Sequence, residues 1–248
     1  MPAVFVHGNP ETDAIWDELR GHLNRQDVVA LSPPGFGAPA GDDFGATSDD
    51  YLAWLVGELE KIEGPIDLVG HDWGGGHVGR LACTRPDLVR SWAIDIAGCF
   101  DPEYVWHDAA QVWQTAGAGE EAVAGMAGAP VEARAAQFES LGMSKDAALR
   151  VSQAVNATMA RCILALYRSA AQPAMGQFGA EFPKAAVKPG LVIIPTEDHY
   201  TGGEVLARRS AGRAGATVAV LQGRGHWWMC EDPAGGAKVL NDFWASLG

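Results

Sequence analysis

The chain has 248 residues, of which 48% are hydrophobic, enough for one domain with a sizeable core and, if present, an inserted subdomain. Its 18 Lys and Arg residues against 31 Asp and Glu give a formal net charge of −13. This acidic balance argues against nucleic acid or an anionic membrane surface as a partner, because either would need a positive patch. The apolar runs are shorter than the roughly 20 residues that span a bilayer, so we expect no membrane segment.

The N-terminal residues and the cysteines indicate the compartment. Residues 1–7 hold no basic segment and no secretory apolar region, which predicts a cytoplasmic protein. No CxxC pair and no zinc-ligand spacing occurs among the four cysteines, Cys83, Cys99, Cys162 and Cys230. We therefore expect reduced, packed thiols, with no metal and no cofactor.

Short apolar runs alternate with helical patterns along most of the chain. The predicted strands are Val4–Val6, Asp27–Leu31, Ile66–Gly70, Ser91–Ala97, Leu191–Pro195 and Thr217–Leu221. Most are apolar throughout, as buried parallel strands are. The alternation predicts an α/β protein with a mostly parallel sheet of about six strands covered by helices.

Residues 100–183 break this alternation, because they contain no convincing strand. Helices are predicted here at Val131–Leu141, Lys145–Val155 and Ala157–Ala171. A helical insertion in a parallel sheet usually covers the carboxyl ends of the strands, where ligands bind. We therefore predict a core domain of residues 1–99 and 184–248 and a helical cap subdomain of residues 100–183.

The strongest motif is IDLVGHDWGGG at residues 66–76. A buried strand runs into Gly-x-Asp-x-Gly and a helix follows, which is the pattern of a nucleophile elbow with Asp72 in place of serine. The small residues on both sides of Asp72 permit the sharp turn. An aspartate that N-caps the next helix is the alternative interpretation.

Two later segments favour the catalytic interpretation of Asp72. The acidic pair Glu197 and Asp198 follows a late strand, and His226 stands in a glycine-rich loop after the next strand. Taken singly, Asp198 as a loop cap and His226 as a packed histidine are the simpler interpretations. Together they give the chain order nucleophile, acid, histidine at the carboxyl ends of parallel strands. Asp198 is preferred as the acid because it lies further past the strand end, with Glu197 as the alternative.

The HGNP segment at residues 7–10 ends the first strand. The backbone N–H groups of Asn9 and Trp73 are placed to converge on one oxygen and form an oxyanion hole. A strand terminator with a cis-proline is compatible with this role.

These motifs resemble the aspartate-nucleophile branch of the α/β-hydrolase superfamily, which contains epoxide hydrolases and haloalkane dehalogenases. The resemblance covers nearly the whole chain and rests on HGNP at 7–10, GHDWGG at 70–75, Asp198 and Gly225-His226. It implies an alkyl ester on Asp72, formed by attack on an sp³ carbon and hydrolysed by water that His226 activates. The implied substrate is a small apolar epoxide or halogenated compound.

The resemblance to epoxide hydrolases rests on Pro10-Glu11, Gly74-Gly75 and Leu166-Tyr167-Arg168. It implies that Tyr167 is the lid acid that protonates the opening alkoxide, with a half-buried packing role as the alternative. The second lid tyrosine is not evident: Ala109 aligns with it, and Tyr104 and His107 are nearby substitutes.

Haloalkane dehalogenases resemble the chain in Asn9 and Trp73, whose amide and indole N–H groups would bind halide. Only Asn9 distinguishes haloalkane dehalogenases from epoxide hydrolases, because Trp73 is also usual in epoxide hydrolases. A non-catalytic ligand-binding protein is a third interpretation, which the complete set of nucleophile, acid and base disfavours.

Four side chains are candidates for the pocket wall, with core packing as the alternative for each: His7, Trp106, Trp113 and Trp227. The chain opens at the Val4–Val6 strand, without the antiparallel pair that precedes it in the superfamily. We therefore expect either a sheet shortened to about six strands or a homo-oligomer in which another subunit covers that edge.

Overall fold

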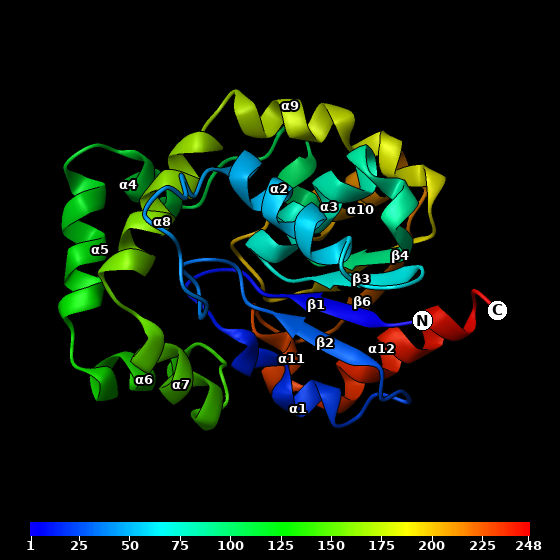
Figure 1. Ribbon diagram of the computed structural model, residues 1–248, viewed down its shortest axis with the longest axis horizontal. Coiled ribbons are helices and arrows are strands. Elements are labelled where there is room, and N and C mark those ends of the chain that lie inside the picture. Colours follow the sequence, from blue (N-terminus) through cyan, green and yellow to red (C-terminus); the bar gives the residue numbers. More distant parts are fainter.

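The computed structural model describes all residues, Met1–Gly248, and its centre is a sheet of six strands (Figure 1). The strands are β1 (Ala3–Val6), β2 (Val28–Leu31), β3 (Ile66–Gly70), β4 (Val89–Ile94), β5 (Gly190–Pro195) and β6 (Thr217–Leu221). They lie in the order β2-β1-β3-β4-β5-β6, and every neighbouring pair is parallel. The predicted six-stranded α/β fold is confirmed.

The burial of the strands follows their place in the sheet. β1, β3 and β5 are buried at every residue, whereas the edge strands β2 and β6 are partly exposed. Uniform burial explains why the central strands read as continuous apolar runs. Pairing of the β2 edge with a second subunit stays a prediction.

The fourth strand ends earlier than the predicted Ser91–Ala97. β4 covers Val89–Ile94, and the chain then turns into a 3-10 helix at Ala97–Phe100. The apolar run continues past the strand because Ile96 and Ala97 are themselves buried in the core. Hydrophobicity alone therefore did not mark the end of the strand.

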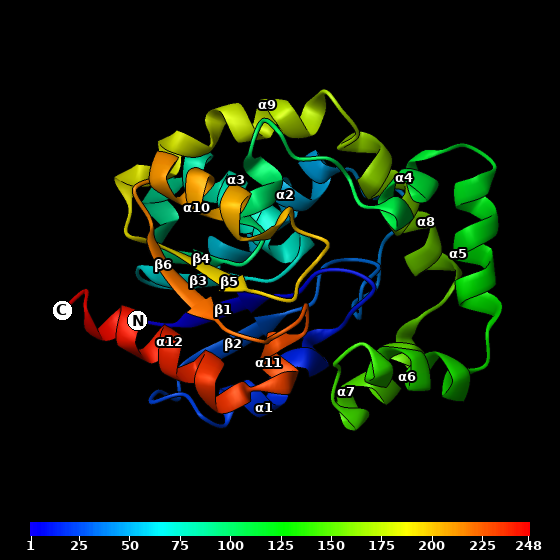
Figure 2. The same ribbon diagram turned by 180° about the vertical axis from the view of Figure 1, so that it is seen from behind.

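Helices cover both faces of the sheet (Figures 1 and 2). On one face lie α2 (Ser48–Leu59), α3 (Trp73–Thr84) and α10 (Gly203–Arg213), and on the other α1 (Asp17–Arg20), α11 (Trp228–Glu231) and α12 (Pro233–Ala245). Alternate residues of β1 serve the two cores. Val4 and Val6 belong to the cluster with α2 and α3, and Ala3 and Phe5 to the cluster with α12.

A group of cap helices stands beyond the carboxyl ends of the strands, on the left in Figure 1. These are α4 (Asp108–Gln114), α5 (Ala118–Gly128), α6 (Val131–Ser140), α7 (Lys145–Ala154) and α8 (Ala157–Ser169). The three helices predicted here are present and end one or two residues earlier than expected. The chain returns through α9 (Ala174–Glu181), which contacts α3 of the core. The division at residues 99 and 183 stays a prediction.

Two further findings concern membranes and disulfides. None of the helices is long and apolar enough to cross a membrane. All four cysteines are unpaired.

Candidate active site

Asp72 occupies a sharp turn between β3 and α3. Its backbone has φ 48° and ψ −127°, a conformation that non-glycine residues rarely adopt. A Cβ on Gly70 would lie 2.5 Å from the carbonyl oxygen of Gly74, and one on Gly74 would lie 2.1 Å from that of Val6. Glycine is therefore required on both sides of the turn. The Asp72 side chain makes no capping bond to α3, so the N-cap alternative is wrong.

His226 and Asp198 lie beside Asp72, each from the loop after a different strand. Nε2 of His226 is 4.0 Å from Oδ2 of Asp72, and Nδ1 of His226 is 2.9 Å from Oδ2 of Asp198. The other oxygen of Asp198 accepts a hydrogen bond from the backbone N–H of Tyr200 at 2.8 Å. Glu197, the alternative acid, is exposed. The three side chains thus lie in the order carboxylate, imidazole, carboxylate.

The charges of this trio are set by burial and by mutual attraction. Burial raises the pKa of Asp72 to about 6, although the nearby His226 opposes the shift. Burial alone would lower the pKa of His226, but the charge and hydrogen bond of Asp198 raise it above its ordinary value. Asp198 keeps a low pKa despite its burial because of the same bond. At neutral pH Asp72 is therefore a desolvated carboxylate, which is a stronger nucleophile than a hydrated one.

One of the two predicted oxyanion donors already contacts Asp72. The backbone N–H of Asn9 donates to Oδ1 of Asp72 at 2.9 Å. The Asn9 side chain is 5% exposed, and neither its oxygen nor its nitrogen has a hydrogen-bond partner. Trp73 is the first residue of α3, and its ring lies 5.3 Å from that of Tyr167.

A second histidine lies beneath the trio in a sealed polar layer. Nε2 of His71 is 3.0 Å from Glu11 and Nδ1 is 2.5 Å from Asp95, and all three side chains are fully or almost fully buried. The indole N–H groups of Trp227 and Trp228 donate to Glu11 and Asp95 respectively. Burial alone would lower the pKa of His71, but the two carboxylates raise it well above the ordinary value. The two carboxylates therefore favour the protonated, cationic form of His71.

The sealed layer also holds the two loops that build the site. Glu11 accepts the backbone N–H of Gly8 at 2.8 Å, one residue before the oxyanion donor Asn9. Asp95 accepts the backbone N–H of Asp72 at 3.1 Å. The HGNP loop and the turn at Asp72 are thus both hydrogen-bonded to the cluster of Glu11, His71 and Asp95. This cluster fixes the position of the Asn9 N–H relative to the Asp72 carboxylate.

Glu11, His71 and His226 present possible metal-ligand atoms within 4.8 Å of one another. Both ring nitrogens of His71 already bond to carboxylates, and the ring is protonated. A protonated imidazole has no lone pair for a metal ion. His71 therefore does not fit a metal site in this arrangement.

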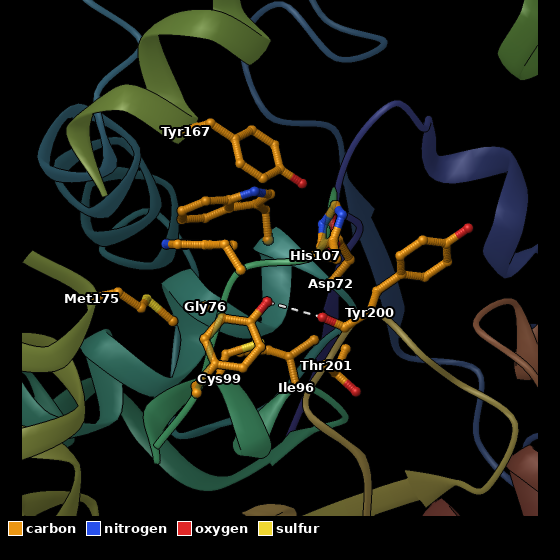
Figure 3. Close-up of a pocket in the computed structure, with 12 residues that line it drawn as sticks. Asp72, Gly76, Ile96, Cys99, His107, Tyr167, Met175, Tyr200 and Thr201 are labelled. Carbon is orange, nitrogen blue, oxygen red and sulfur yellow. Dashed lines mark hydrogen bonds between the residues drawn. The ribbon is translucent and has the colours of Figure 1, made fainter. Parts of the chain in front are cut away.

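Two cavities meet at Asp72. The larger, of about 440 Å³, extends from Asp72 and His226 to α5 and α6 of the cap. The smaller, of about 30 Å³, lies on the other side and is lined by Ile96, Cys99 and Met175 among others (Figure 3). Both cavities are lined mainly by hydrophobic residues. Four residues line both: Asp72, His107, Tyr167 and Tyr200.

The predicted pocket residues divide between these cavities, with one exception. Trp106 lines the smaller cavity, and Trp113 and Trp227 line the larger. His7 lines neither, so its prediction as a pocket residue is wrong. It is fully buried, and its ring bonds to the carbonyl of Gly8 and to the Ser32 hydroxyl. These two bonds connect the HGNP loop to Ser32, the residue after β2.

The lid candidates also differ in where they point. Tyr167 comes from α8, is 2% exposed, and packs its ring 4.7 Å from that of Trp113. Tyr104 donates its hydroxyl to the carbonyl of Tyr200 at 2.9 Å, the dashed line in Figure 3. Ala109 lines the larger cavity but carries no polar group. Tyr104 and Tyr167 both line the smaller cavity with Asp72, and of the two only Tyr167 also lines the larger one.

A profile of the Alpha/beta hydrolase family matches residues 3–239. The chain belongs to this family. An epoxide hydrolase from Caballeronia sordidicola is 36% identical over 98 residues, which are 36% of this chain and 29% of that protein. The (E)-2-((N-methylformamido)methylene)succinate hydrolase from Acinetobacter baylyi is 27% identical over 95 residues, 38% of this chain and 36% of that protein. The chain thus matches only about a third of the length of these hydrolases.

Solved structures of the family superimpose over nearly the whole chain. The haloalkane dehalogenase DbeA from Bradyrhizobium elkani has a TM-score of 0.74 at 20% identity, and the match covers 99% of this chain and 90% of that one. NosK from Streptomyces actuosus has a TM-score of 0.66 at 24% identity, covering 99% and 98%. These likenesses show the shared α/β-hydrolase fold, and the chemistry of this family member must be argued from its own residues.

Asp95 and the polar layer around His71 are the parts of the site that sequence reasoning missed. A signal was present, because Asp95 is an acidic residue at the end of a buried strand, as Asp198 is. The predicted strand Ser91–Ala97 concealed it by running through Asp95. His71 does not stand out in the sequence, because a histidine next to the nucleophile turn has no pattern that reveals its partners.

Proposed function

We propose that this α/β hydrolase opens an epoxide to a diol through an ester formed on Asp72. The observation that carries the proposal is the carboxylate at the nucleophile elbow, with Nε2 of His226 4.0 Å from it and the Asn9 N–H bonded to it. A carboxylate that attacks an sp³ carbon forms an ester, which water can hydrolyse. A serine at the same place would form a stable ether from such a substrate.

In the first step, one oxygen of Asp72 attacks a ring carbon of the epoxide. The C–O bond breaks, and its electron pair stays on the ring oxygen, which takes a proton from the Tyr167 hydroxyl. Burial and the charge of Asp72 raise the pKa of Tyr167 well above the ordinary value, so the phenol is protonated and available as an acid.

In the second step, water attacks the ester carbonyl of Asp72 while His226 takes one of its protons. The Asn9 N–H stabilises the oxyanion, because it already lies at hydrogen-bond distance from Oδ1. The ester C–O bond then breaks, and His226 returns its proton to the departing alcohol. The carboxyl group left on Asp72 ionises, and this proton restores the Tyr167 phenol.

The two cavities support an apolar substrate with one small and one bulky substituent. The smaller cavity has room for one or two water-sized groups, and the larger takes a ring or a branched chain. An epoxide ring at Asp72 would direct its small substituent to the Ile96 side and its bulky substituent toward α5 and α6. A terminal epoxide with one aromatic group, such as styrene oxide, fits this division.

The test is a single turnover in ¹⁸O-water with enzyme in excess over styrene oxide. The first diol should contain no ¹⁸O from solvent, and the label should be found in the Asp72 carboxylate by peptide mass. Label in the first diol would overturn the ester mechanism. Neither turnover nor an Asp72 adduct with a panel of epoxides and bromoalkanes would favour a ligand-binding protein.

A haloalkane dehalogenase is the second candidate, and the Asn9 side chain favours it. Its buried amide and the Trp73 indole both lie next to the Tyr167 hydroxyl, where their N–H groups would donate hydrogen bonds to a departing halide. Tyr167→Phe should slow diol formation about 10²–10⁴-fold and leave bromide release unchanged, because halide leaves without a proton. Asn9→Ala should impair bromide release more than diol formation. Bromide release by the wild type without diol formation would reverse the choice.

A further inference from the structure

The larger cavity has one residue of each fixed charge in its lining. Asp72 is its only Asp or Glu residue, and Arg134 is its only Lys or Arg residue. Asp72 lies at the carboxyl end of β3, whereas Arg134 belongs to α6 of the cap. An epoxide at Asp72 would therefore direct its bulky substituent toward the charge of Arg134.

Arg134 is a buried cation without a carboxylate partner. It is 5% exposed, and it is the only arginine or lysine among the buried residues of the chain. All of its hydrogen bonds go to backbone carbonyl groups. Burying a cation without an anion costs free energy, so the protein by itself leaves this charge incompletely compensated.

The carbonyl groups that hold Arg134 stand at the ends of two cap helices. Nη1 donates to Met126 and Ala129 at 2.7 and 2.6 Å, where α5 ends, with a longer bond of 3.4 Å to Ala127. Nη2 donates to Ser152 at 2.7 Å, in the last turn of α7. A cation is favourable at such helix ends, because their carbonyl groups are partly negative and lack helical partners. Arg134 thus connects α5 to α7, which lies beside α6 in Figure 1.

This structural role leaves two N–H groups of the guanidinium unused. The short bonds to the helix ends use both N–H groups of Nη1 and one of Nη2. Nε has no hydrogen-bond partner, and the second N–H of Nη2 has no acceptor in the protein. Adjacent N–H groups of this kind bind the two oxygens of a carboxylate. The unused donors and the uncompensated charge therefore point to the same kind of ligand.

We propose that Arg134 binds a carboxylate on the bulky substituent of the substrate, so that this enzyme opens epoxides of carboxylic acids with an apolar spacer. The inference rests on the epoxide hydrolysis proposed above. The ring carbon meets Asp72, the spacer fills the hydrophobic part of the larger cavity, and the carboxylate pairs with Arg134. A neutral epoxide such as styrene oxide reaches Asp72 without forming this pair.

The face of α6 that carries Arg134 also reaches solvent. Gln137 and Leu141 follow Arg134 by one and two turns on the same face, and both line the larger cavity. Both are exposed. The cavity therefore opens along this face, and a carboxylate reaches Arg134 without passing through the apolar part of the cavity.

The experiment compares epoxides that differ only in charge. One pair is styrene oxide with a para carboxylate and styrene oxide with a para carboxamide, and a second pair carries the same groups on a longer alkyl spacer. We expect the wild type to open at least one acid with a kcat/KM about 10–100-fold above that of its amide, the effect of one charge-assisted pair. Equal values, or a preference for the amide, in both pairs would overturn the role of Arg134.

Substitutions assign the preference to Arg134. Arg134→Gln keeps an amide donor for the helix ends but removes the charge, and the ratio of acid to amide should fall to about one or lower, because Asp72 repels a second anion. Arg134→Lys keeps the charge without the paired donors and should give an intermediate ratio. The ratio is measured within one enzyme preparation, so partial unfolding of a variant does not change it.

The matched control is Arg161→Gln. Arg161 is an exposed arginine of α8 that lines neither cavity. This substitution removes the same charge from the cap and should leave the ratio of acid to amide unchanged. A ratio that survives Arg134→Gln, or that falls equally in Arg161→Gln, would overturn pairing at Arg134.

Binding without turnover separates this proposal from the epoxide chemistry. Calorimetry with para-ethylbenzoate and para-ethylbenzamide should show tighter binding of the acid to the wild type, and this measurement requires no variant to fold. If the acid binds more tightly but no epoxide is opened, the carboxylate site stands and the epoxide chemistry is overturned. If styrene oxide is opened but neither binding nor turnover favours the acid, the carboxylate site is overturned and the epoxide chemistry stands.

Discussion

Two buried histidines lie side by side in this protein, with ring centroids 4.6 Å apart, and only one has a ring nitrogen available for the proposed role as a base. His71 bonds to Glu11 through one nitrogen and to Asp95 through the other. His226 bonds to Asp198 through Nδ1 and leaves Nε2 facing Asp72 beside the larger cavity. His71 therefore bonds to one more carboxylate than His226 does, and His226 keeps one ring nitrogen without a hydrogen bond.

The comparison teaches how the same side chain becomes either a structural cation or a catalytic group. Two carboxylates favour the protonated form of His71, whereas a base must be able to lose its proton. The positive charge of His71 also lowers the pKa of its neighbour, which opposes the upward pull of Asp198 on His226. We infer that the sealed layer helps to keep His226 available for proton transfer near neutral pH.

The largest expected effect comes from removing the carboxylate that His226 faces. Asp72→Ala should reduce diol formation by roughly 10⁴-fold or more, because no ester can form. Asp72→Asn keeps the shape of the side chain and should raise the free energy of unfolding at pH 8 by about 1–3 kcal/mol.

The sign of that stability gain follows from the pKa of Asp72. Its value of about 6 in the fold lies above the ordinary 3.8, so the ionised carboxylate costs stability above pH 6. Below the ordinary value this cost disappears. Denaturant unfolding at pH 8 and at pH 4 should therefore show the gain at pH 8 and little at pH 4. An equal difference at both values would contradict the assigned shift.

The second effect tests whether His71 can substitute for its neighbour. His226→Gln should lower turnover about 10²–10⁴-fold and let the Asp72 ester accumulate, visible by intact mass. His71 lies close by but has both nitrogens engaged, so it cannot activate the water. Turnover that persists without adduct would show that another group is the base.

The third effect is on stability, and it applies to the sealed layer. Glu11 accepts three N–H donors, from Gly8, His71 and Trp227, and glutamine has one acceptor oxygen in place of two. Glu11→Gln should lower the free energy of unfolding by about 3–5 kcal/mol, the cost of breaking a buried ion pair. The matched control Glu197→Gln, at an exposed carboxylate, should change it by no more than about 0.5 kcal/mol.

The pH dependence of this loss has a definite direction. Burial alone would raise the pKa of Glu11, but His71 lowers it to about 2. The stabilisation is therefore complete above the ordinary value of 4.5 and is lost as the pH falls toward 2. The stability gap between wild type and Glu11→Gln should narrow below pH 4.5. A gap that widens there would contradict the ionised state of Glu11.

The smallest effect is the acid limb of the activity. Because the pKa of Asp72 is about 6, kcat/KM for ester formation should fall about tenfold per pH unit below 6, as the carboxylate protonates. A pH series with one epoxide at limiting concentration checks this. Activity that stays level down to pH 4 would place the Asp72 pKa near its ordinary value.

Much of the fold could be predicted from the sequence because its signals are local. Parallel strands buried on both faces are apolar throughout, and this pattern located all six within three residues at each end. The glycines around Asp72 identify the turn, since a Cβ at Gly70 or Gly74 would overlap backbone atoms. The chain order of Asp72, Asp198 and His226 then pointed to one edge of the sheet, where the structure brings them together.

What the sequence by itself determined is therefore the sheet, the nucleophile turn and the candidate trio, because strand burial and glycine geometry leave marks on neighbouring residues. Only the tertiary structure decided which carboxylates surround His71 and which cap side chains reach the cavities at Asp72. Glu11 and Asp95 reach His71 from separate loops. Tyr104, His107 and Ala109 lie within six positions of one another, and the packing of the cap places Tyr104 at the smaller cavity, Ala109 at the larger and His107 at both.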